Sequence, residues 1–298
     1  MIRLAVRVAG EHAETVLAEL LELAPAGVEE VRQEAGTVEY AVYGPPGELP
    51  ALPDLRALAG GALVELSTSE IPDDWHERWR EFHRPVLIEA PGRAVGERAP
   101  VPSLRVRPPW EPADAAREAT VREIVIDPGQ AFGTGGHAST RLCLGLLLEL
   151  AAAERARAAV LDVGTGSGVL AIAAAALGYR PVLALDNEQE SVDAARENAI
   201  VNGTPIEVRR FDLRSQALPW PTEPGGREHE TVVLANLLRP LLLELAATLP
   251  VAPAHLLAGG LLAAEVDELA GAFASRLRLR ERARRESGEW AAVWLSVR

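Results

Sequence analysis

The sequence predicts an α/β protein in two parts, a small α+β domain followed by a larger domain built around a parallel sheet. In residues 1–68, short segments with alternating apolar residues flank segments with helical spacing. From Glu123 onward, apolar runs such as VLDVG, VLALD and TVVLAN alternate with Ala- and Leu-rich helical segments, as in a parallel sheet covered by helices. We therefore expect a first domain at 1–68, a connection at 69–118 and a second domain at 119–298.

The first part has the element order of a ferredoxin-like fold. Apolar and polar residues alternate from Ile2 to Val8, as in a half-buried strand, and Glu11 to Leu23 carries apolar residues at helical spacing. The remaining predicted elements are a hairpin at 28–31 and 37–42, a short helix at 53–58 and a strand at 62–66. The order β-α-β-β-α-β is that of a ferredoxin-like domain.

The expected connection begins with a short helix at 73–82, DDWHERWREF. Trp75 and Trp79 lie four residues apart, on one helical face, and are expected to be packing residues rather than a cage for a methylated amine. Residues 85–112 are rich in Pro, Gly and Arg and are expected to be extended or loop, with a surface insertion at 90–103.

The composition is that of a globular protein, since 48% of the 298 residues are hydrophobic. The single cysteine, Cys143, excludes an intramolecular disulfide and fits a reducing compartment. The apolar stretches at 160–177 and 234–249 are interrupted by Gly, Asp, Asn or Pro, and the N-terminus has no secretory signal pattern. We therefore expect a cytoplasmic monomer without a membrane or metal partner.

The net charge of −13 bears on the class of partner. An acidic surface repels phosphate backbones, so no direct nucleic-acid binding is expected, whereas a basic protein would be attracted. Solubility alone is the simpler explanation for such a surface. All 30 basic residues are arginine, for which codon bias is a sufficient explanation, and the chain has no lysine of its own to modify.

The strongest local signal is the glycine-rich sequence VLDVGTGSGVLAIA, which starts at Val160. An apolar strand ends near Asp162, and Gly164, Gly166 and Gly168 precede a helix. Dinucleotide-binding enzymes carry a similar turn. Two details favour a methyl donor: the G-x-G-x-G spacing, and a carboxylate at Asp162 that would repel a pyrophosphate but could hold the cationic amino group of S-adenosylmethionine.

Two further carboxylates follow the next strands. Asp186 ends the run VLALD, where a carboxylate can accept both ribose hydroxyls of a nucleotide. A helix-capping role is the structural alternative for Asp186. Asp212 follows the strand at 206–211 and could accept from the exocyclic amine of adenine.

Residues 127–141, DPGQAFGTGGHASTR, form a loop rich in backbone donors that leads into a helix. This segment resembles D-P-G-x-A-F-G-T-G-x-H-x-T-T of the ribosomal protein L-eleven methyltransferases, which modify lysine side chains and the N-terminal amine of that protein. The chain departs from that pattern at Ser139. The resemblance implies an S-adenosylmethionine-dependent, Rossmann-like methyltransferase domain preceded by a ferredoxin-like domain that recognises the substrate.

Other segments carry the same resemblance. TVVLANLLRP at 231–240 is similar to the family's A-N-I-L-x-x-P-L, with one residue fewer before the proline, and segments at 74–86, 105–110 and 288–294 also match. No pair of prolines follows Asn236, in contrast to methyltransferases that act on adenine or on glutamine amides. The absence of that motif favours an aliphatic amine as the acceptor.

The resemblance also implies roles for individual residues. The positions that match cofactor contacts of the family are Thr140, Gly164, Asp186 and Asn236. The cofactor site is further expected to include Phe132, Gly133, Asp162, Gly166 and Asp212. Asn236 and Thr134 are expected to position the acceptor amine, and His137 is expected to order the glycine loop rather than to act as a base.

Two alternatives to this function are kept. One is a methyltransferase of the same fold that acts on another protein or a small amine, because the resemblance over residues 1–68 rests on pattern alone. The other is a nicotinamide-dependent oxidoreductase, against which Asp162 and the glycine spacing both argue. A binding measurement distinguishes the two alternatives, because the first binds S-adenosylmethionine and the second binds a nicotinamide cofactor.

Overall fold

The computed structural model divides the chain into two compact units, Met1–Phe82 and His83–Arg298. It describes residues 2–13, 16, 20, 28–34, 36–44, 62–70, 83–92, 101–114, 119–128, 133–154, 158–221 and 231–297. The helices expected at 53–58 and 73–82, and most of the one expected at 11–23, lie outside these residues. The boundary between the units falls inside the expected connection, and residues 83–114 belong to the second unit.

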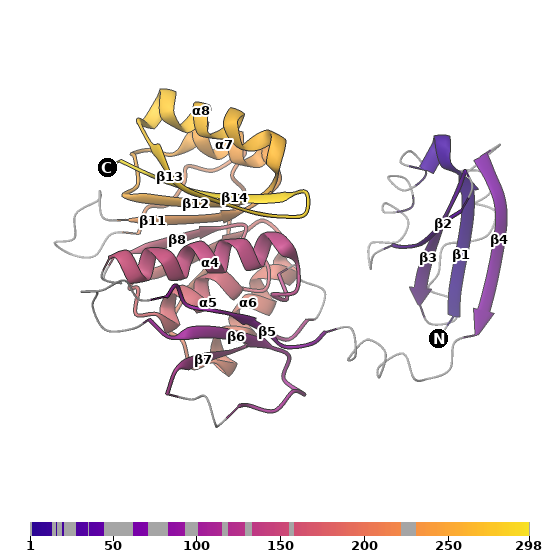
Figure 1. Ribbon diagram of the computed structural model, residues 1–298, viewed down its shortest axis with the longest axis horizontal. Coiled ribbons are helices and arrows are strands. Elements are labelled where there is room, and N and C mark those ends of the chain that lie inside the picture. Colours follow the sequence, from indigo (N-terminus) through magenta and orange to yellow (C-terminus); the bar gives the residue numbers. More distant parts are fainter. Residues whose placement is uncertain are drawn as a thin grey trace. The chain divides into compact units, whose positions relative to one another are not determined.

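The first unit contains a four-stranded antiparallel sheet with the order β2-β3-β1-β4 (Figure 1). Its strands are β1 (Ile2–Ala9), β2 (Glu29–Glu34), β3 (Thr37–Gly44) and β4 (Leu63–Glu70). Alternate residues of β1, namely Leu4, Val6 and Val8, pack in the core of this unit with Val38 and Tyr40. The strand order is that of a ferredoxin-like fold, so the predicted hairpin and the predicted fourth strand are confirmed.

The second unit is built on a seven-stranded sheet with the order β10-β9-β8-β11-β12-β14-β13. Its strands are β8 (Val160–Val163), β9 (Val182–Asp186), β10 (Glu207–Arg210), β11 (Val232–Asn236), β12 (His255–Leu262), β13 (Arg280–Ser287) and β14 (Trp290–Ser296). The first five are parallel, and β14 runs antiparallel to both β12 and β13. Strand order reverses between β8 and β11, and such a switch point is where open α/β sheets bind ligands.

Helices cover both faces of this sheet (Figure 1). Their bounds are α4 (Ala138–Ala153), α5 (Val169–Ala176), α6 (Gln189–Val201), α7 (Arg239–Thr248) and α8 (Val266–Leu277). Residues of α4, α5 and α6 share one buried cluster with Val160 of β8, whereas α7 and α8 share a second cluster with the next residue, Leu161. The apolar runs of the sequence are therefore central strands buried on both faces, as parallel strands usually are.

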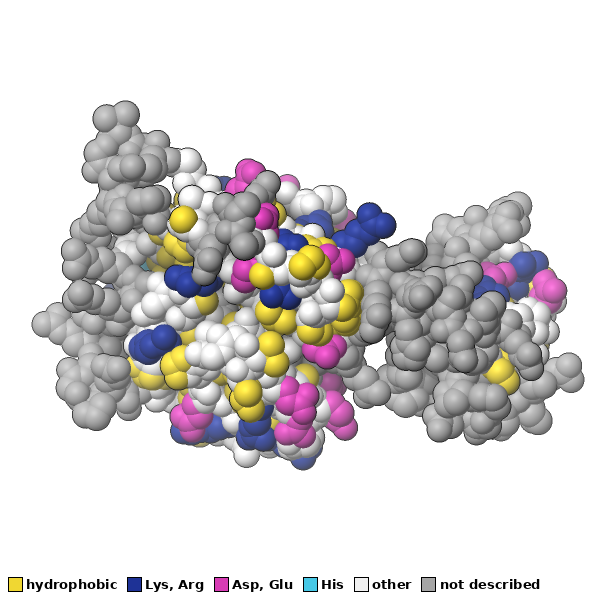
Figure 2. Space-filling model, turned by 90° about the horizontal axis from the view of Figure 1, so that it is seen from below, with side chains coloured by type: hydrophobic (Ala, Val, Ile, Leu, Met, Phe, Trp, Pro, Cys, Tyr) yellow, Lys and Arg dark blue, Asp and Glu magenta, His cyan; other side chains and the backbone are white. Residues whose placement is uncertain are grey.

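On the face drawn in Figure 2, acidic and basic side chains of the described residues are interspersed with apolar ones. Within the described part of the chain, no helix is both long enough and apolar enough to cross a membrane.

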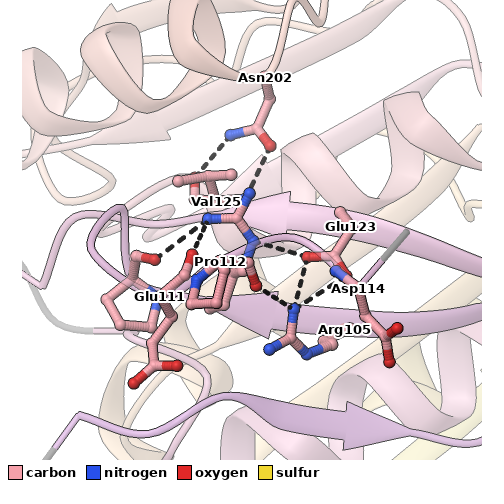
Figure 3. Close-up of polar contacts among 9 residues, drawn as sticks. Arg105, Glu111, Pro112, Asp114, Glu123, Val125 and Asn202 are labelled. Atoms are coloured by element: carbon pink, nitrogen blue, oxygen red, sulfur yellow. Dashed lines mark hydrogen bonds and ion pairs between the residues drawn. The ribbon is translucent and has the colours of Figure 1, made fainter. Parts of the chain in front are cut away.

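A small third sheet takes two of its strands from residues 69–118, the expected connection, and its third strand from the start of the expected second domain. It has the order β5-β6-β7, with β5 at Val86–Ile88, β6 at Ser103–Arg107 and β7 at Val121–Val125. Glu123 accepts hydrogen bonds from Arg105 at 3.0 Å and from Arg107 at 2.7 Å, and Arg105 also donates to the carbonyl of Pro112 (Figure 3). The two arginines hold the pKa of Glu123 below its usual value, against the opposing effect of burial. Arginines in this segment therefore order a turn and a sheet.

Candidate functional site

A pocket of about 470 Å³ lies at the carboxyl ends of β8, β9 and β11, and we call it the main pocket. A smaller one of about 170 Å³, the side pocket, shares Gly164, Asp186 and Leu237 with it. Both lie where the strand order reverses. Among the described residues, no group of three or more His, Cys, Asp or Glu side chains could hold a metal ion.

The glycine-rich turn after β8 lines the main pocket through Gly164 and Gly166. Gly164, Gly166 and Gly168 have φ values of 74°, 53° and 85°, in the region that favours glycine. The backbone N–H groups of Gly164 and Thr165 donate to the carbonyl of Leu185 in β9. A Cβ atom on Gly164 would force the end of the Leu237 side chain to shift, so the positive φ is the main reason for glycine at this position.

Asp186, at the end of β9, lies on the walls of both pockets and is 8% exposed. Its Oδ2 accepts a hydrogen bond from the Gly166 N–H at 2.8 Å, and its Oδ1 accepts one from the Glu188 N–H at 3.1 Å. The carboxylate is thus fixed against the glycine turn by two backbone donors. This geometry leaves further lone pairs of both oxygens for hydroxyl groups of a ligand.

Asp162 lies in a different environment from the one expected. Its side chain has no exposed surface, accepts a hydrogen bond from the Thr165 hydroxyl at 2.7 Å, and is not on the wall of either pocket. Burial raises the pKa of Asp162 to about 7. The Thr165 bond ties Asp162 to the glycine turn, while its Oδ1 is buried without a hydrogen-bond partner among the described residues. Contact of Asp162 with a ligand amino group stays a prediction.

Asn236 and Thr140 come together from distant parts of the chain. Asn236 ends β11, Thr140 lies in the first turn of α4, and the Asn236 amide donates to the Thr140 hydroxyl at 3.3 Å. Both residues lie on the wall of the main pocket. The Oδ1 atom of Asn236 is buried and has no hydrogen-bond donor among the described residues. It is an acceptor that a donor group of a ligand could satisfy.

His137 is the N-cap of α4 and also lines the main pocket. Its Nδ1 accepts a hydrogen bond from the Ser139 N–H at 3.3 Å, and its ring meets Trp290 edge to face, with centroids 4.7 Å apart. Burial, aided by the positive charge of Arg141, lowers the pKa of His137, which favours the neutral ring. The capping bond is consistent with the ordering role predicted for His137.

The other predicted residues are spread between the two pockets. Gly133 lines the main pocket, whereas Thr134 is on the wall of neither. Asp212 lines the side pocket, where its carboxylate accepts from the Arg214 N–H and from the Ser215 hydroxyl, and these bonds lower its pKa. Phe132 lies outside the described residues.

Several residues of the pocket wall were not predicted from the sequence, chiefly Gly260 and Trp290. Gly260 has a φ of 77° at an irregularity in the pairing of β12 with β14. The adjacent pair Gly259-Gly260 within an apolar run is a signal for such a bulge. Trp290 begins β14, and only the complete sheet order places it beside His137.

The chain is similar to proteins of one family over most of its length. The family model described as "Ribosomal protein L11 methyltransferase (PrmA)" matches residues 57–297. A protein of that name from Heliobacterium modesticaldum is 37% identical over 227 residues, and the alignment covers 74% of this chain and 63% of that protein. More than a third of that relative is therefore unmatched. A second, from Myxococcus xanthus, is 38% identical over 250 residues, which cover 79% of this chain and 78% of the relative.

A solved structure shows the same similarity in three dimensions. The crystal structure of a ribosomal protein L11 methylase from Lactobacillus delbrueckii subsp. bulgaricus is 31% identical in sequence and superposes with a TM-score of 0.54. The superposition covers 65% of this chain and 94% of the solved one. The resemblance noted in the sequence therefore extends to the backbone.

Proposed function

Because the chain belongs to the ribosomal protein L11 methyltransferase family, we propose that it transfers methyl groups from S-adenosylmethionine to amines of ribosomal protein L11. The acceptors are lysine side chains and the N-terminal amine. The observation that carries this proposal is the Asp186 carboxylate, which two backbone N–H groups hold against the glycine turn on the wall of both pockets.

The residues present fit S-adenosylmethionine. The main and side pockets meet at Asp186, so a ribose bound there can direct an adenine toward Asp212 and a methionine chain toward Thr140 and Asn236. The unsatisfied Oδ1 of Asn236 suits the amine that accepts the methyl group. When bound, S-adenosylmethionine supplies a methyl group activated by a sulfonium.

The protein's part in the reaction is to align donor and acceptor, which supplies much of the rate of such a displacement. The acceptor amine must be neutral, yet a lysine has a pKa of about 10.4 in water. Buried apolar residues of the pocket wall, such as Val169 and Leu170, disfavour the charged ammonium by desolvation. Asn236 holds the amine in line through its carbonyl oxygen. Thr134, which is not on a pocket wall, stays a prediction as a second positioning residue.

We place the reaction in the cytoplasm, with a monomeric enzyme and a basic ribosomal protein as substrate. The net charge of −13 favours association with a basic protein and disfavours direct contact with nucleic acid.

Mass spectrometry of purified ribosomal protein L11, after incubation with the enzyme and S-adenosylmethionine, tests the proposal. We expect mass gains of whole methyl units on lysines or on the N-terminal amine, and no gain with Asp186→Ala. Since the enzyme contains no lysine, every methylated lysine in the mixture comes from the substrate. If the enzyme binds S-adenosylmethionine but L11 gains no mass, L11 is not the substrate. If the enzyme does not bind S-adenosylmethionine, this molecule is not its methyl donor.

A further inference from the structure

Asn198 connects two segments that contribute to the main pocket, although it does not line the pocket itself. It lies on α6 and is 3% exposed. Its Oδ1 accepts a hydrogen bond from the Asp127 N–H at 3.0 Å, and its Nδ2 donates to the carbonyl of Ser167 at 2.9 Å. One amide group therefore joins the segment after β7 to the glycine turn after β8.

Ser167 extends the same connection. Its side chain has no exposed surface, and its hydroxyl donates to the carbonyl of Gly133 at 2.7 Å. Asp127 and Gly133 are therefore both anchored to Ser167, the first through Asn198 and the second directly. Gly133 lines the main pocket and leads into the cap of α4, so its position affects the pocket wall.

Asn202 provides an internal comparison, because it lies one helical turn after Asn198. Its amide exchanges two hydrogen bonds with the backbone of Val125 in β7, at 2.8 and 2.6 Å (Figure 3). It also donates to the backbone carbonyl of Asn198 at 2.7 Å, a bond that does not involve the Asn198 side chain. The two bonds to Val125 attach β7 to α6 but touch neither the glycine turn nor Gly133. Both asparagines accept a backbone N–H and donate to a backbone carbonyl through the side-chain amide. They differ in the segments that these bonds connect to α6.

We propose that Asn198, acting with Ser167, is a positioning residue that fixes the Asp127 and Gly133 backbones against the glycine turn and thereby sets donor affinity and the rate of methyl transfer. Removal of the Asn198 amide leaves the Asp127 N–H and the Ser167 carbonyl without partners, and both atoms then seek other ones. As a result, the glycine turn and the cap of α4 are no longer held in a fixed position relative to each other. The part concerning methyl transfer rests on the proposed function.

The test compares Asn198→Ala and Ser167→Ala with the control Asn202→Ala. We expect the first two to raise the Kd of S-adenosylmethionine, measured by calorimetry, and to lower kcat, each by about tenfold or more. Asn202→Ala should lower Tm about as much as Asn198→Ala does, but it should leave Kd and kcat within about twofold of the values of the unmodified protein. Asn198→Asp keeps the acceptor for Asp127 and should regain part of the lost affinity.

A second measurement is independent of donor and substrate. Hydrogen exchange of the free protein should accelerate in Asn198→Ala at residues 126–128, 133–140 and 164–168, whereas in Asn202→Ala it should accelerate only near Val125. The proposal would be overturned if Asn198→Ala and Asn202→Ala showed the same pattern of hydrogen exchange. It would also be overturned if Kd and kcat changed in proportion to the loss of Tm in both variants. If the unmodified protein binds no S-adenosylmethionine, the proposed function fails, and the exchange result still decides whether Asn198 anchors the turn.

Discussion

Two aspartates at the ends of neighbouring strands, Asp162 and Asp186, have opposite surroundings. Asp186 lies at the pocket surface with two backbone donors, whereas Asp162 is fully buried and has one hydroxyl donor, Thr165. A carboxylate that lies on a pocket wall and is held by N–H groups suits ligand binding, while a fully buried one with a raised pKa suits bracing of the turn.

The first prediction concerns Asp186. Asp186→Asn keeps the shape of the side chain but replaces one acceptor oxygen with a donor, which opposes either the Gly166 N–H or the Glu188 N–H. We expect the Kd of S-adenosylmethionine to rise about 100-fold, with Asp186→Ala at least as weak, in calorimetric titrations. Asp193→Ala, an exposed change on α6 away from both pockets, is the control. An affinity for Asp186→Asn within about threefold of the control would contradict the assigned role.

The second prediction concerns the pH dependence of stability at Asp162. Its pKa rises from 3.8 to about 7 on folding, because burial disfavours the charged form, and the nearby charge of Asp186 acts in the same direction. Between these two values the folded state binds the proton and the unfolded state does not, so stability falls as pH rises. Above pH 7 the stability that this proton contributes to the folded state is lost completely. Cys143, whose pKa is raised to about 12 by burial, stays neutral throughout this range.

Asp162→Asn removes this titration. We expect the free energy of unfolding of the variant, relative to the unmodified protein, to increase between pH 5 and pH 7 by up to about 1.4 kcal/mol per pH unit. Urea denaturation at several pH values measures the difference. A difference that does not change with pH would show that Asp162 is charged in the folded protein across this range.

At the scale of elements, β12 illustrates how a strand can be shaped for the pocket beside it. Its pairing with β14 shifts register between Ala258 and Leu261. Of the two glycines in between, Gly260 allows the backbone to approach Leu237, and Gly259 lies against Cys143 and Asn236. A Cβ atom on Gly260 would lie 2.5 Å from the Leu237 carbonyl oxygen, and the φ of 77° is itself unfavourable for alanine.

The third prediction follows from this bulge. Gly260→Ala should lower the free energy of unfolding by about 2 kcal/mol or more and should weaken donor binding, since Leu237 lines both pockets. Gly271→Ala, in α8, is the matched control, because nothing lies within 4 Å of its added Cβ. Alanine should stabilise that helix by about 0.5–1 kcal/mol. Thermal unfolding and calorimetry of both variants check the prediction, and similar behaviour of the two would refute it.

The elements also show what the sequence could predict and what it could not. Strands β8, β9 and β11 are recognisable because each is a short apolar run that ends in a polar residue, and the glycine turn follows from local spacing. The segment of β5 and β6 resembles a loop because its pairing partners are distant and its arginines are bound by Glu123. Asn198 resembles a surface residue of a polar helix, and only the folded structure brings Asp127 and Ser167 to it.

The same limit applies to the pocket. Asp186 and Asn236 are recognisable because the carboxyl ends of parallel strands meet at one edge of the sheet. Trp290 is not, because its position depends on the placement of β14 between β12 and β13. For Asp162 the sequence shows only that the residue is next to the turn, and the structure adds that its side chain has no exposed surface and is on the wall of neither pocket.

At the scale of the whole molecule, the fourth prediction concerns its charge. A net charge of −13 should draw a basic protein substrate by long-range attraction, which salt screens over a Debye length of about 10 Å at 0.1 M. We expect KM for ribosomal protein L11 to rise severalfold between about 50 and 500 mM salt, while kcat changes little. Donor affinity, measured at the same salt concentrations, is the control. A KM that does not depend on salt would show that contacts other than charge determine association.

The position of β14 has a consequence for protein synthesis. It lies between β12 and β13 in the sheet although it follows both in the chain, and its first residue, Trp290, is part of the pocket wall. A nascent chain translated as far as Ser287 holds β13 without the neighbour with which it pairs. Chains fold as they emerge from the ribosome, so the wall of the main pocket is complete only when β14 has left the exit tunnel. A translational arrest upstream of Trp290 therefore yields a protein that lacks part of the wall of the main pocket, however well the earlier strands have folded.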